Sequence, residues 1–552
     1  MKAIAHAFFV VPALFFSVWP CVANGIIKRE ILAVYNSREE PGPSDSRLHK
    51  FLELPLNHLG YSVHYQDAQD PLPDAVEAGR RFAAVVTWFV DQGTVTRAYL
   101  RWASSVSRSG AKLIILGRVG GDETGQDLDL ANDILGQLGL RYTGDYISST
   151  AGVRLLSSDV TAFDFEAKLG NDFRAFPVSV VAKPDVVPIL EVGIAGEDSR
   201  RLILAATSAG GGYATLDYEM RHDRNADCIR WLLNPFIFLQ RALGRSRWPI
   251  PDVTTVSGRR LYFSHIDGDG WNNGTRDTRP ASDQKLAAEV LLDDLIAPYP
   301  ELPVTIAPIA SDLMVGEGRG GSLESGAIAQ RLFALSQVEV GSHTLTHPFD
   351  WSFFADYDRS REVGVITKAE SGADTRVINW FNRLLRGDKA LISGSADTPR
   401  AFMSEPFDLQ KEVERAIEVT EQFAPEGKRV RLYQWSGNAR PFADAIKQAR
   451  LSGLRNINGG DSRFDADFPS VAYVAPISRQ VGEERQIYAV NSNENTYTND
   501  WTGPFYGYQN LDKTLANTEE PRRLKGFNVY YHVYSAERRA SLDAVRAMLD
   551  LA

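Results

Sequence analysis

Residues 261–273 read LYFSHIDGDGWNN, and this stretch indicates how the second half of the chain folds. Residues 261–264 have strand-forming character and lead through His265 to two aspartates two positions apart, Asp267 and Asp269. A glycine follows each aspartate, which lets the backbone turn tightly and come close to another group. Two carboxylates this close repel each other unless a cation or a shared proton compensates them. The stretch therefore predicts a metal site at the C-terminal end of a strand.

The composition indicates a soluble protein with more than one domain. The chain has 552 residues, which is more than one hydrophobic core usually serves. Its 44% hydrophobic and 24% charged residues are ordinary for a globular protein. The formal net charge is −10, and no basic stripe offsets it, so we expect no nucleic acid as a partner.

The first 23 residues are predicted to be a secretory signal peptide. Lys2 precedes an apolar run over residues 7–18, and small residues close the segment around Ala23. The run is short for a spanning helix and no later segment is long enough, so we expect no transmembrane segment. We therefore expect a periplasmic or secreted protein. Without its signal peptide the chain keeps one cysteine, Cys228, and cannot form an internal disulfide.

Residues 24–243 alternate in the way of a doubly wound α/β domain. Four apolar, β-branched runs are typical of buried parallel strands: ILAVYNS, AAVVTWF, KLIILG and RLILAAT. The segment SRLHKFLELPLNHLG has helical periodicity, and CIRWLLNPFIFLQRAL is predicted to be an apolar helix that buries Cys228. Flavodoxin-like and glutamine-amidotransferase-like folds share this alternation, but no nucleophile elbow is present. We expect a non-catalytic domain with a structural or glycan-contacting role.

Residues 244–260 are rich in proline, arginine and serine and are predicted to be a linker to a second domain over residues 261–552. Eight strands are expected in that domain: LYFSHID, PVTIAPI, VEVGSH, VRLYQWS, LRNING, VAYVAP, QIYAVN and FNVYYHVY. Helices such as DLQKEVERAIEVTEQF and ARPFADAIKQAR lie between some of them. Repeated strand–helix units favour a complete or partial β/α barrel whose strand C-termini carry the chemistry.

A second motif, VEVGSHTLTHPFDW, follows another predicted strand. It places His343 and His347 four residues apart, a spacing that on one face of a helical turn can chelate one metal ion. The alternative is two polar residues on a solvated loop. Together with the paired acids at the end of a different strand, the metal interpretation is favoured. One carboxylate and two imidazoles leave positions on zinc for a water and a substrate oxygen.

HIDGD followed by SHTLTH resembles the first two motifs of the metal-dependent polysaccharide deacetylases of carbohydrate esterase family 4. The resemblance implies that Asp267 is the general base and that Asp269, His343 and His347 hold the metal. Zinc is the default ion, although Co²⁺ or Ni²⁺ would satisfy the same ligands.

SHIDGDGW, YQWSGNARP, NINGGD and YYHVYSA are more similar still to the deacetylase part of Pel exopolysaccharide-modifying proteins. This likeness runs from Leu261 to the C-terminus, and an α/β domain before the deacetylase is also similar to that group. The N-terminal glycosidase domain of many such proteins has no room here, so cutting of the polymer is not expected.

Three further site residues are implied by the same resemblance. Arg440 in YQWSGNARP would hold the base, because a guanidinium pairs a carboxylate in a fixed orientation; the alternative is a helix-capping surface arginine. Asp461 in NINGGD is the candidate of the fourth motif, but the tryptophan that follows it in the family is missing, which leaves its role open. His532 in FNVYYHVYSA is either the general acid or a satisfied core histidine.

The segment TYTNDWTGPFYGYQN, residues 496–510, carries four aromatic side chains: Trp501, Phe505, Tyr506 and Tyr508. Aromatic rings stack on sugar faces, but they also pack loops against a barrel. Both interpretations stay open.

The sequence therefore predicts a metal-dependent hydrolase that removes N-acetyl groups from an aminosugar-containing exopolysaccharide during its export or the formation of a biofilm matrix. The expected partners are the polysaccharide and the exopolysaccharide export machinery. The alternative from another class is a carbohydrate-binding or assembly protein with a degenerate or structural metal site. A glycosidase is disfavoured, because acids two residues apart on one strand end are hard to place on opposite sides of a glycosidic bond.

Overall fold

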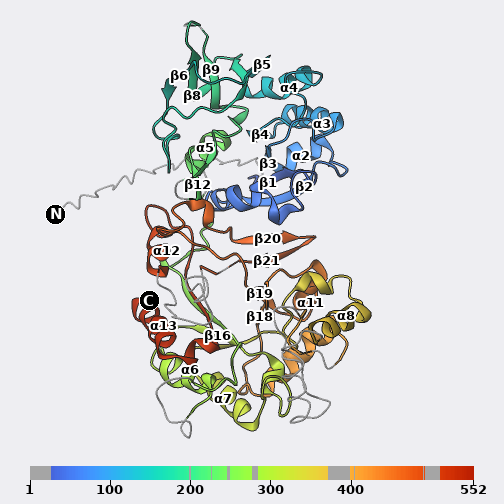
Figure 1. Cartoon of the computed structure of the whole chain (residues 1–552), viewed down its shortest axis with the longest axis vertical. Helices are drawn as coiled ribbons and strands as arrows, with labels where there is room; N and C mark the ends of the chain where they lie inside the picture. The colour runs from blue at the N-terminus through green and yellow to red at the C-terminus, as the bar shows by residue number, and fades with distance from the viewer. Residues whose placement is uncertain are drawn as a thin grey trace, which may run out of the picture.

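The structure is a computed structural model, which describes residues 27–197, 200–224, 227–244, 249–275, 284–370, 398–402, 405–488, 490–491 and 510–552. The predicted signal peptide and the aromatic residues from Trp501 to Tyr508 lie outside the described residues. Two large sheets carry the described part of the chain, and Figure 1 shows them one above the other along the long axis. None of the helices described combines the length and the apolarity needed to cross a membrane.

The N-terminal sheet has eight strands in the order β2-β1-β3-β4-β10-β9-β8-β6. Its strands are β1 (Glu30–Tyr35), β2 (Ser62–Asp67), β3 (Phe82–Phe89), β4 (Lys112–Gly117), β6 (Val153–Ser158), β8 (Val187–Ile194), β9 (Leu202–Ser208) and β10 (Gly211–Thr215). The first five strands in that order are parallel to one another, and the last three pair antiparallel. The parallel strand predicted at RLILAAT is therefore wrong in direction, because residues 209–210 join β9 directly to β10 and so short a connection forces antiparallel pairing.

Helices cover both faces of the parallel half of this sheet, and alternate residues of β1 show it. Ile31 and Ala33 belong to one apolar core, while Leu32 and Val34 belong to the other. The helices are α1 (Glu53–His58), α2 (Ala75–Arg81), α3 (Arg97–Arg108), α4 (Leu128–Leu135) and α5 (Pro235–Leu243). This half follows the doubly wound pattern, whereas the antiparallel half departs from a flavodoxin-like arrangement.

The stretch predicted as one apolar helix from Cys228 is split into a strand and a helix. Cys228–Trp231 forms β12, which pairs with β11 (Met220–Asp223). The helix begins only at Pro235, because the Asn234 side chain caps it and a proline suits the first helical position. Cys228 is buried, as predicted. A second small pair, β5 (Leu140–Ile147) with β7 (Phe176–Val181), completes this region.

The C-terminal sheet has six strands in the order β19-β18-β17-β16-β15-β22, and all of its pairings are parallel. The strands are β15 (Tyr262–Asp267), β16 (Val304–Ala307), β17 (Val338–Ser342), β18 (Leu432–Gln434), β19 (Arg455–Ile457) and β22 (Phe527–His532). In the described residues β19 and β22 do not pair with each other, so this sheet is open, as in a partial barrel.

Two of the eight predicted strands are not in this sheet. VAYVAP contains the 3₁₀ turn η9 (Val471–Tyr473), and QIYAVN begins in β21 (Glu484–Ile487), which pairs antiparallel with β20 (Ser478–Val481). The two-residue turn between β20 and β21 contains Gly482 with φ +58°, the left-handed conformation that tight hairpins need. A 3₁₀ turn and a hairpin therefore take the place of the two expected barrel strands.

Helices surround the C-terminal sheet and bury its main core and three smaller apolar clusters. They are α6 (Ala287–Leu291), α7 (Leu323–Ala334), α8 (Arg359–Glu370), α10 (Ala416–Glu421), α11 (Ala443–Leu451), α12 (Leu511–Asn517) and α13 (Arg539–Leu551). Ile266, Ile306, Val340 and Val529 from four adjacent strands are buried in this core. Between the two sheets the short strands β13 (Thr255–Val256) and β14 (Arg259–Arg260) pair inside the predicted linker.

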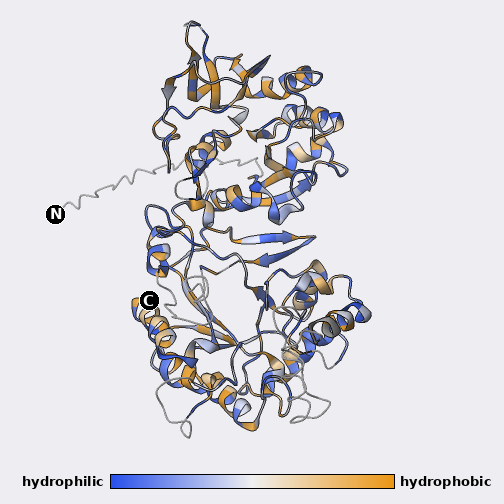
Figure 2. Cartoon of the chain, in the orientation of Figure 1, coloured by the Kyte–Doolittle hydropathy of each residue, from blue (hydrophilic) through white to orange (hydrophobic). Residues whose placement is uncertain are grey.

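The two parts of the chain pack against each other through polar and apolar contacts. The β20–β21 hairpin, which Figure 2 shows as largely hydrophilic, donates from Arg485 to the Val63 carbonyl at 2.5 Å. Glu166 accepts hydrogen bonds from the Ser470 hydroxyl at 2.6 Å and the Val471 amide at 2.8 Å. Val471 also joins the apolar core of the N-terminal part. These contacts hold the C-terminal part against the N-terminal part.

Candidate metal centre

Parallel pairing brings the C-terminal ends of the strands, and the polar residues at them, to one edge of the C-terminal sheet. β15 ends at Asp267, which lies opposite His532 at the end of β22. β17 ends one residue before His343, and β18 ends at Gln434. Since these strands are neighbours, side chains far apart in the sequence meet here.

The glycines of the opening stretch are explained by two close approaches of the backbone. A Cβ at Gly268 would lie 2.6 Å from the Pro308 Cα, in the loop after β16. Gly270 has φ +87°, and a Cβ there would lie 2.6 Å from the Tyr534 Cβ. Both positions therefore exclude a side chain. The turn that presents Asp269 is clamped between the loops after β16 and β22.

Asp269, His343 and His347 form a cluster whose ligand atoms all lie within 4.8 Å of one another. The Asp269 carboxylate oxygens lie 3.2 Å from His343 Nε2 and 3.1 Å from His347 Nε2. Both imidazoles are buried, whereas the carboxylate is partly exposed. The cluster is therefore open on the carboxylate side.

The two histidines do not lie on a helical turn, which corrects that prediction. Thr344 and His347 both have positive φ, 72° and 54°, so the chain bends irregularly between them. Glu412 holds the bend, because its carboxylate accepts from the Leu345 amide at 2.9 Å and the Thr346 amide at 2.8 Å. Positive φ is strained for residues with a side chain, and this strain is stored at the site.

The unpaired polar atoms of the cluster fit a divalent cation. The His347 ring is buried; its Nδ1 has no hydrogen-bond partner, and its Nε2 faces an Asp269 oxygen at 3.1 Å. Burial, opposed by the Asp269 carboxylate, lowers the pKa of His347 and keeps the ring neutral with a lone pair to donate. His343 donates from Nδ1 to the Gln434 carbonyl at 3.0 Å, which leaves Nε2 for a metal. Burial raises the pKa of Asp269, but the two histidines outweigh it and hold that pKa well below its usual range.

Asp267 is separate from this cluster and is held by neutral donors. Its carboxylate accepts from the Asn458 amide at 2.9 Å and from the Tyr530 hydroxyl at 2.5 Å. His343 Nδ1 lies 3.2 Å from the other side of the carboxylate. The Gln434 amide also faces it, in the orientation in which its nitrogen donates. Asp267 is therefore fixed in orientation and is poised beside the metal ligands rather than among them.

Arg440 is not the residue that orients Asp267, contrary to the prediction. Its guanidinium donates to the Asp45 carboxylate of the N-terminal part at 3.1 Å, and both side chains are substantially exposed. The chain after β18 carries Arg440 toward the N-terminal part, where its guanidinium is paired with Asp45. Asn458 and Tyr530 take that orienting role instead.

A buried chain of polar side chains stands behind Asp267. Burial lowers the pKa of His265 to about 4, so the ring is neutral at neutral pH. Its Nδ1 accepts from the Asn528 amide at 3.2 Å, which places the proton on Nε2, and Nε2 donates to the Asn458 carbonyl oxygen at 2.8 Å. With its oxygen engaged, Asn458 can only present its amide nitrogen to Asp267. His265 thus fixes the orientation of Asn458.

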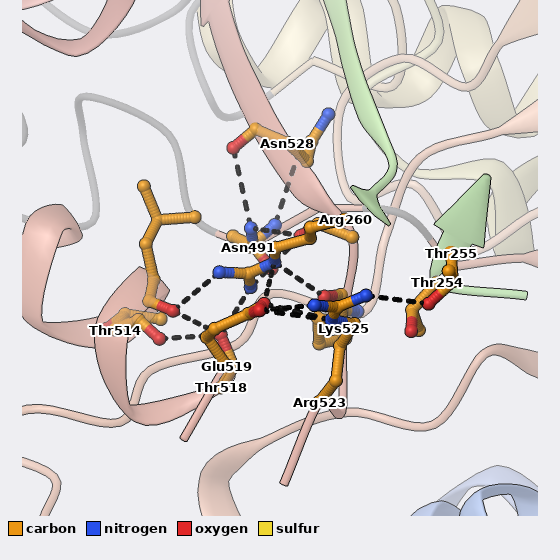
Figure 3. Close-up of polar contacts among 12 residues, drawn as sticks. Thr254, Thr255, Arg260, Asn491, Thr514, Thr518, Glu519, Arg523, Lys525 and Asn528 are labelled. Carbon is orange, nitrogen blue, oxygen red and sulfur yellow. Dashed lines mark hydrogen bonds and ion pairs between the residues drawn. The ribbon is translucent and has the colours of Figure 1, made fainter. Parts of the chain in front are cut away.

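The far end of this chain is anchored where β22 begins, as Figure 3 shows for Arg260, Asn491 and Asn528. The Asn491 amide donates to the Gly526 carbonyl at 3.2 Å, and its backbone N–H donates to the Asn528 side chain at 3.4 Å. Arg260 donates to the Lys525 carbonyl at 3.0 Å and pairs with Glu519 at 3.2 Å. The entry of β22 is held on several sides, which fixes Asn528 under His265.

His532 lies at the edge of the site within reach of Asp267. Its Nε2 is 3.9 Å from an Asp267 oxygen, and the Tyr534 hydroxyl lies 2.7 Å from Nδ1. The ring stacks on Tyr534 with centroids 4.6 Å apart, and 12% of the side chain is exposed. A fully enclosed core histidine would have no access to a substrate, whereas this ring has both access and a fixed orientation.

Asp461 is close enough to His532 for their charges to interact. Desolvation raises its pKa, and the charges of Lys525 and His532 lower it. No hydrogen bond connects Asp461 to the metal cluster or to Asp267 among the described residues. Lys525, which the sequence did not suggest, is buried with no hydrogen-bond partner for its ammonium, and burial lowers its pKa to about 8.

Several side chains at the site were missed from the sequence, and they share one signal. Each lies within four residues of the end of a predicted strand: Asp312, Gln434, Asn458 and Tyr530. Asp312 is buried beside the cluster, and burial raises its pKa to about 7. Position at a strand end would have found them, whereas residue type alone did not.

Comparison with known proteins adds two distant likenesses. No family model and no curated protein matches the chain. A solved T48 deacetylase with substrate is similar at 11% identity and a TM-score of 0.23, over 52% of this chain and 81% of that one. A peptidoglycan N-acetylglucosamine deacetylase in complex with a benzamide ligand is similar at 10% identity and a TM-score of 0.25, over 52% and 80%. At these values neither likeness decides what this chain does.

Proposed function

We propose that the protein is a metal-dependent hydrolase that removes N-acetyl groups from an aminosugar-containing polysaccharide. The observation that carries the proposal is the arrangement of side chains at one sheet edge, where a three-ligand cluster lies beside a further carboxylate. Asp269, His343 and His347 are a three-ligand cluster open on one side. Asp267, held by Asn458 and Tyr530, is a second carboxylate that is not one of these three ligands.

Each side chain of the site has a defined task in amide hydrolysis. A divalent cation, when bound by the cluster, supplies Lewis acidity for the acetyl carbonyl. Asp267 accepts a proton from the attacking water as the water oxygen bonds to the carbonyl carbon. His532, held by Tyr534, donates a proton to the sugar nitrogen as the C–N bond breaks. The products are acetate and a free amine.

Zinc is the proposed metal, because two imidazoles and one carboxylate leave it open coordination positions. Co²⁺ and Ni²⁺ accept the same ligands. The donor set contains no thiolate, and nitrogen and oxygen ligands of this kind do not discriminate strongly among these ions. The metal is therefore assigned by class.

We also propose a periplasmic or secreted location and a role in the export or matrix formation of the exopolysaccharide, with the export machinery as partner. Support comes from the signal-peptide pattern of residues 1–23 and from the motif resemblance to Pel exopolysaccharide-modifying proteins.

Release of acetate from an N-acetylglucosamine tetramer tests the proposal. The zinc-loaded protein is expected to release acetate and to create one free amine for each acetate. Asp269→Asn is expected to lose both metal and acetate release. A protein that holds stoichiometric zinc and binds the oligomer but releases no acetate would instead support the carbohydrate-binding alternative.

A further inference from the structure

A second cavity lies in the N-terminal part, far from the metal cluster in the sequence. Its volume is about 510 Å³, within the range of sites that hold small molecules. Its lining comes from the segments after β1 and β10 and from the end of β3. In open α/β sheets ligands bind at this carboxyl edge of the parallel strands.

Four guanidinium groups line the cavity: Arg47, Arg174, Arg221 and Arg224. Arg174 and Arg221 share the single carboxylate of Asp172, at 3.2 and 3.0 Å. Asp172 is more than half exposed, and exposed ion pairs contribute little, so a bound anion can replace it at small cost. The Nε of Arg221 is buried and has no hydrogen-bond partner. The other nitrogens of Arg221 donate to the Asp172 and Asp217 carbonyls at 2.6 and 3.2 Å, and Arg47 pairs with Glu40 at 2.8 Å. The buried Nε of Arg221 is therefore the donor that is not committed to the protein among these groups.

One of the two acidic residues of the lining, Glu219, adds little negative charge. Burial raises its pKa to about 8, so that it is mostly protonated at neutral pH. Its oxygen accepts from the Trp88 indole at 2.7 Å. The Phe51 and Trp88 rings lie with centroids 6.0 Å apart and form an aromatic wall. Aromatic walls beside hydrogen-bond donors suit a sugar ring.

We propose that this cavity binds a saccharide unit that carries one anionic group, a carboxylate or a phosphate, with the arginines on the anion and the aromatic wall against the ring. Guanidinium groups pair both anions in a bidentate manner, so the chemistry is shared between the two sources. The inference does not depend on the proposed deacetylase function, because it uses no residue of the metal cluster.

Calorimetric titration of the full mature protein tests the inference with four probes: a trimer of glucuronic acid, glucose 6-phosphate, a neutral glucose trimer and inorganic phosphate. At least one acidic sugar is expected to bind at least about tenfold more tightly than the neutral trimer and inorganic phosphate. The acidic sugar that binds identifies the source of the anion. Raising the salt concentration is expected to weaken its binding. His343→Ala is expected to leave this binding unchanged.

The variant Arg174→Gln with Arg224→Gln is expected to weaken the binding about tenfold. Arg108→Gln with Arg154→Gln removes the same charge from exposed positions of the same region and is the matched control. Arg224→Gln alone serves if the first variant fails to fold. The inference is overturned if neither acidic sugar binds, if inorganic phosphate binds as tightly as the sugar phosphate, or if the control loses as much affinity.

Discussion

The two large sheets of this chain place different side chains at the carboxyl edge of their parallel strands. At the carboxyl edge of the C-terminal sheet, Asp269 lies between two imidazoles that hold its pKa far below the usual range. At the carboxyl edge of the N-terminal sheet, Glu219 lies among apolar groups and arginines, and burial raises its pKa to about 8. One carboxylate is kept ionised at the proposed cation site, and the other is kept neutral beside the proposed anion site. The backbone architecture supplies the meeting point, and the neighbours of each acid decide its charge.

The largest expected effect is at the metal cluster. His347→Ala removes a proposed ligand whose Nε2 faces Asp269 at 3.1 Å, so bound zinc and acetate release should both disappear. His222→Ala, an exposed histidine of the N-terminal part, is the control and should change neither. Metal content by elemental analysis and acetate release are measured on the same samples. Full metal occupancy in His347→Ala would exclude this residue as a ligand.

The second effect separates the two acids of the opening stretch. Asp267→Asn should retain zinc and lower kcat about 10²- to 10⁴-fold, because the proton acceptor is lost while the ligands remain. Zinc affinity and kcat are compared with those of Asp269→Asn, in which zinc should be lost first. If Asp267→Asn loses zinc and Asp269→Asn keeps it, the roles are exchanged.

A smaller effect is expected behind Asp267. His265→Phe keeps a ring against Tyr530 but removes the donor that fixes Asn458, so kcat should fall about 10- to 100-fold with zinc and KM unchanged. His265→Gln, which can still donate to Asn458, should recover part of the loss. A merely structural histidine would lower the melting temperature in both variants without this recovery.

A change at Glu219 in the N-terminal part should affect catalysis least. Its effect should be on the free energy of unfolding. The folded state holds the Glu219 proton up to a pKa of about 8, whereas the unfolded chain releases it near 4.5. Glu219 should therefore lower the free energy of unfolding as the pH rises from about 4.5 to about 8. Glu219→Gln should remove this loss and gain on the order of a few kcal/mol at pH 9. The free energy of unfolding is measured for the protein and for Glu219→Gln from pH 5 to pH 9. A difference between the two that stays constant over this range would contradict a buried neutral acid.

Much of the metal cluster could be predicted from the sequence because its residues lie in two short sequence motifs. The paired acids after a strand-forming run and the two histidines four residues apart are both visible without a fold. Their geometry was not, because the bend between His343 and His347 depends on Glu412, some 65 residues further along the chain. A pattern shows which residues meet, but not the backbone that joins them.

The environment of Asp267 was out of reach for a different reason. Asn458, Gln434 and Tyr530 are neutral groups, and neutral groups at strand ends have no charge pattern that marks them. The error on Arg440 has a similar origin, since its partner Asp45 is 395 residues away and lies in the N-terminal part. The direction of β9 and the β20–β21 hairpin depended on turn lengths that apolar periodicity does not reveal.

If the open cluster of Asp269, His343 and His347 drives amide hydrolysis through a bound metal, acetate release should depend on that metal. Acetate release from the N-acetylglucosamine tetramer, measured before metal removal, after dialysis against a chelator and after addition of one equivalent of zinc, tests it most directly. Activity should be lost with the metal and return in proportion to the zinc that rebinds. Acetate release that persists in fully stripped protein would contradict it.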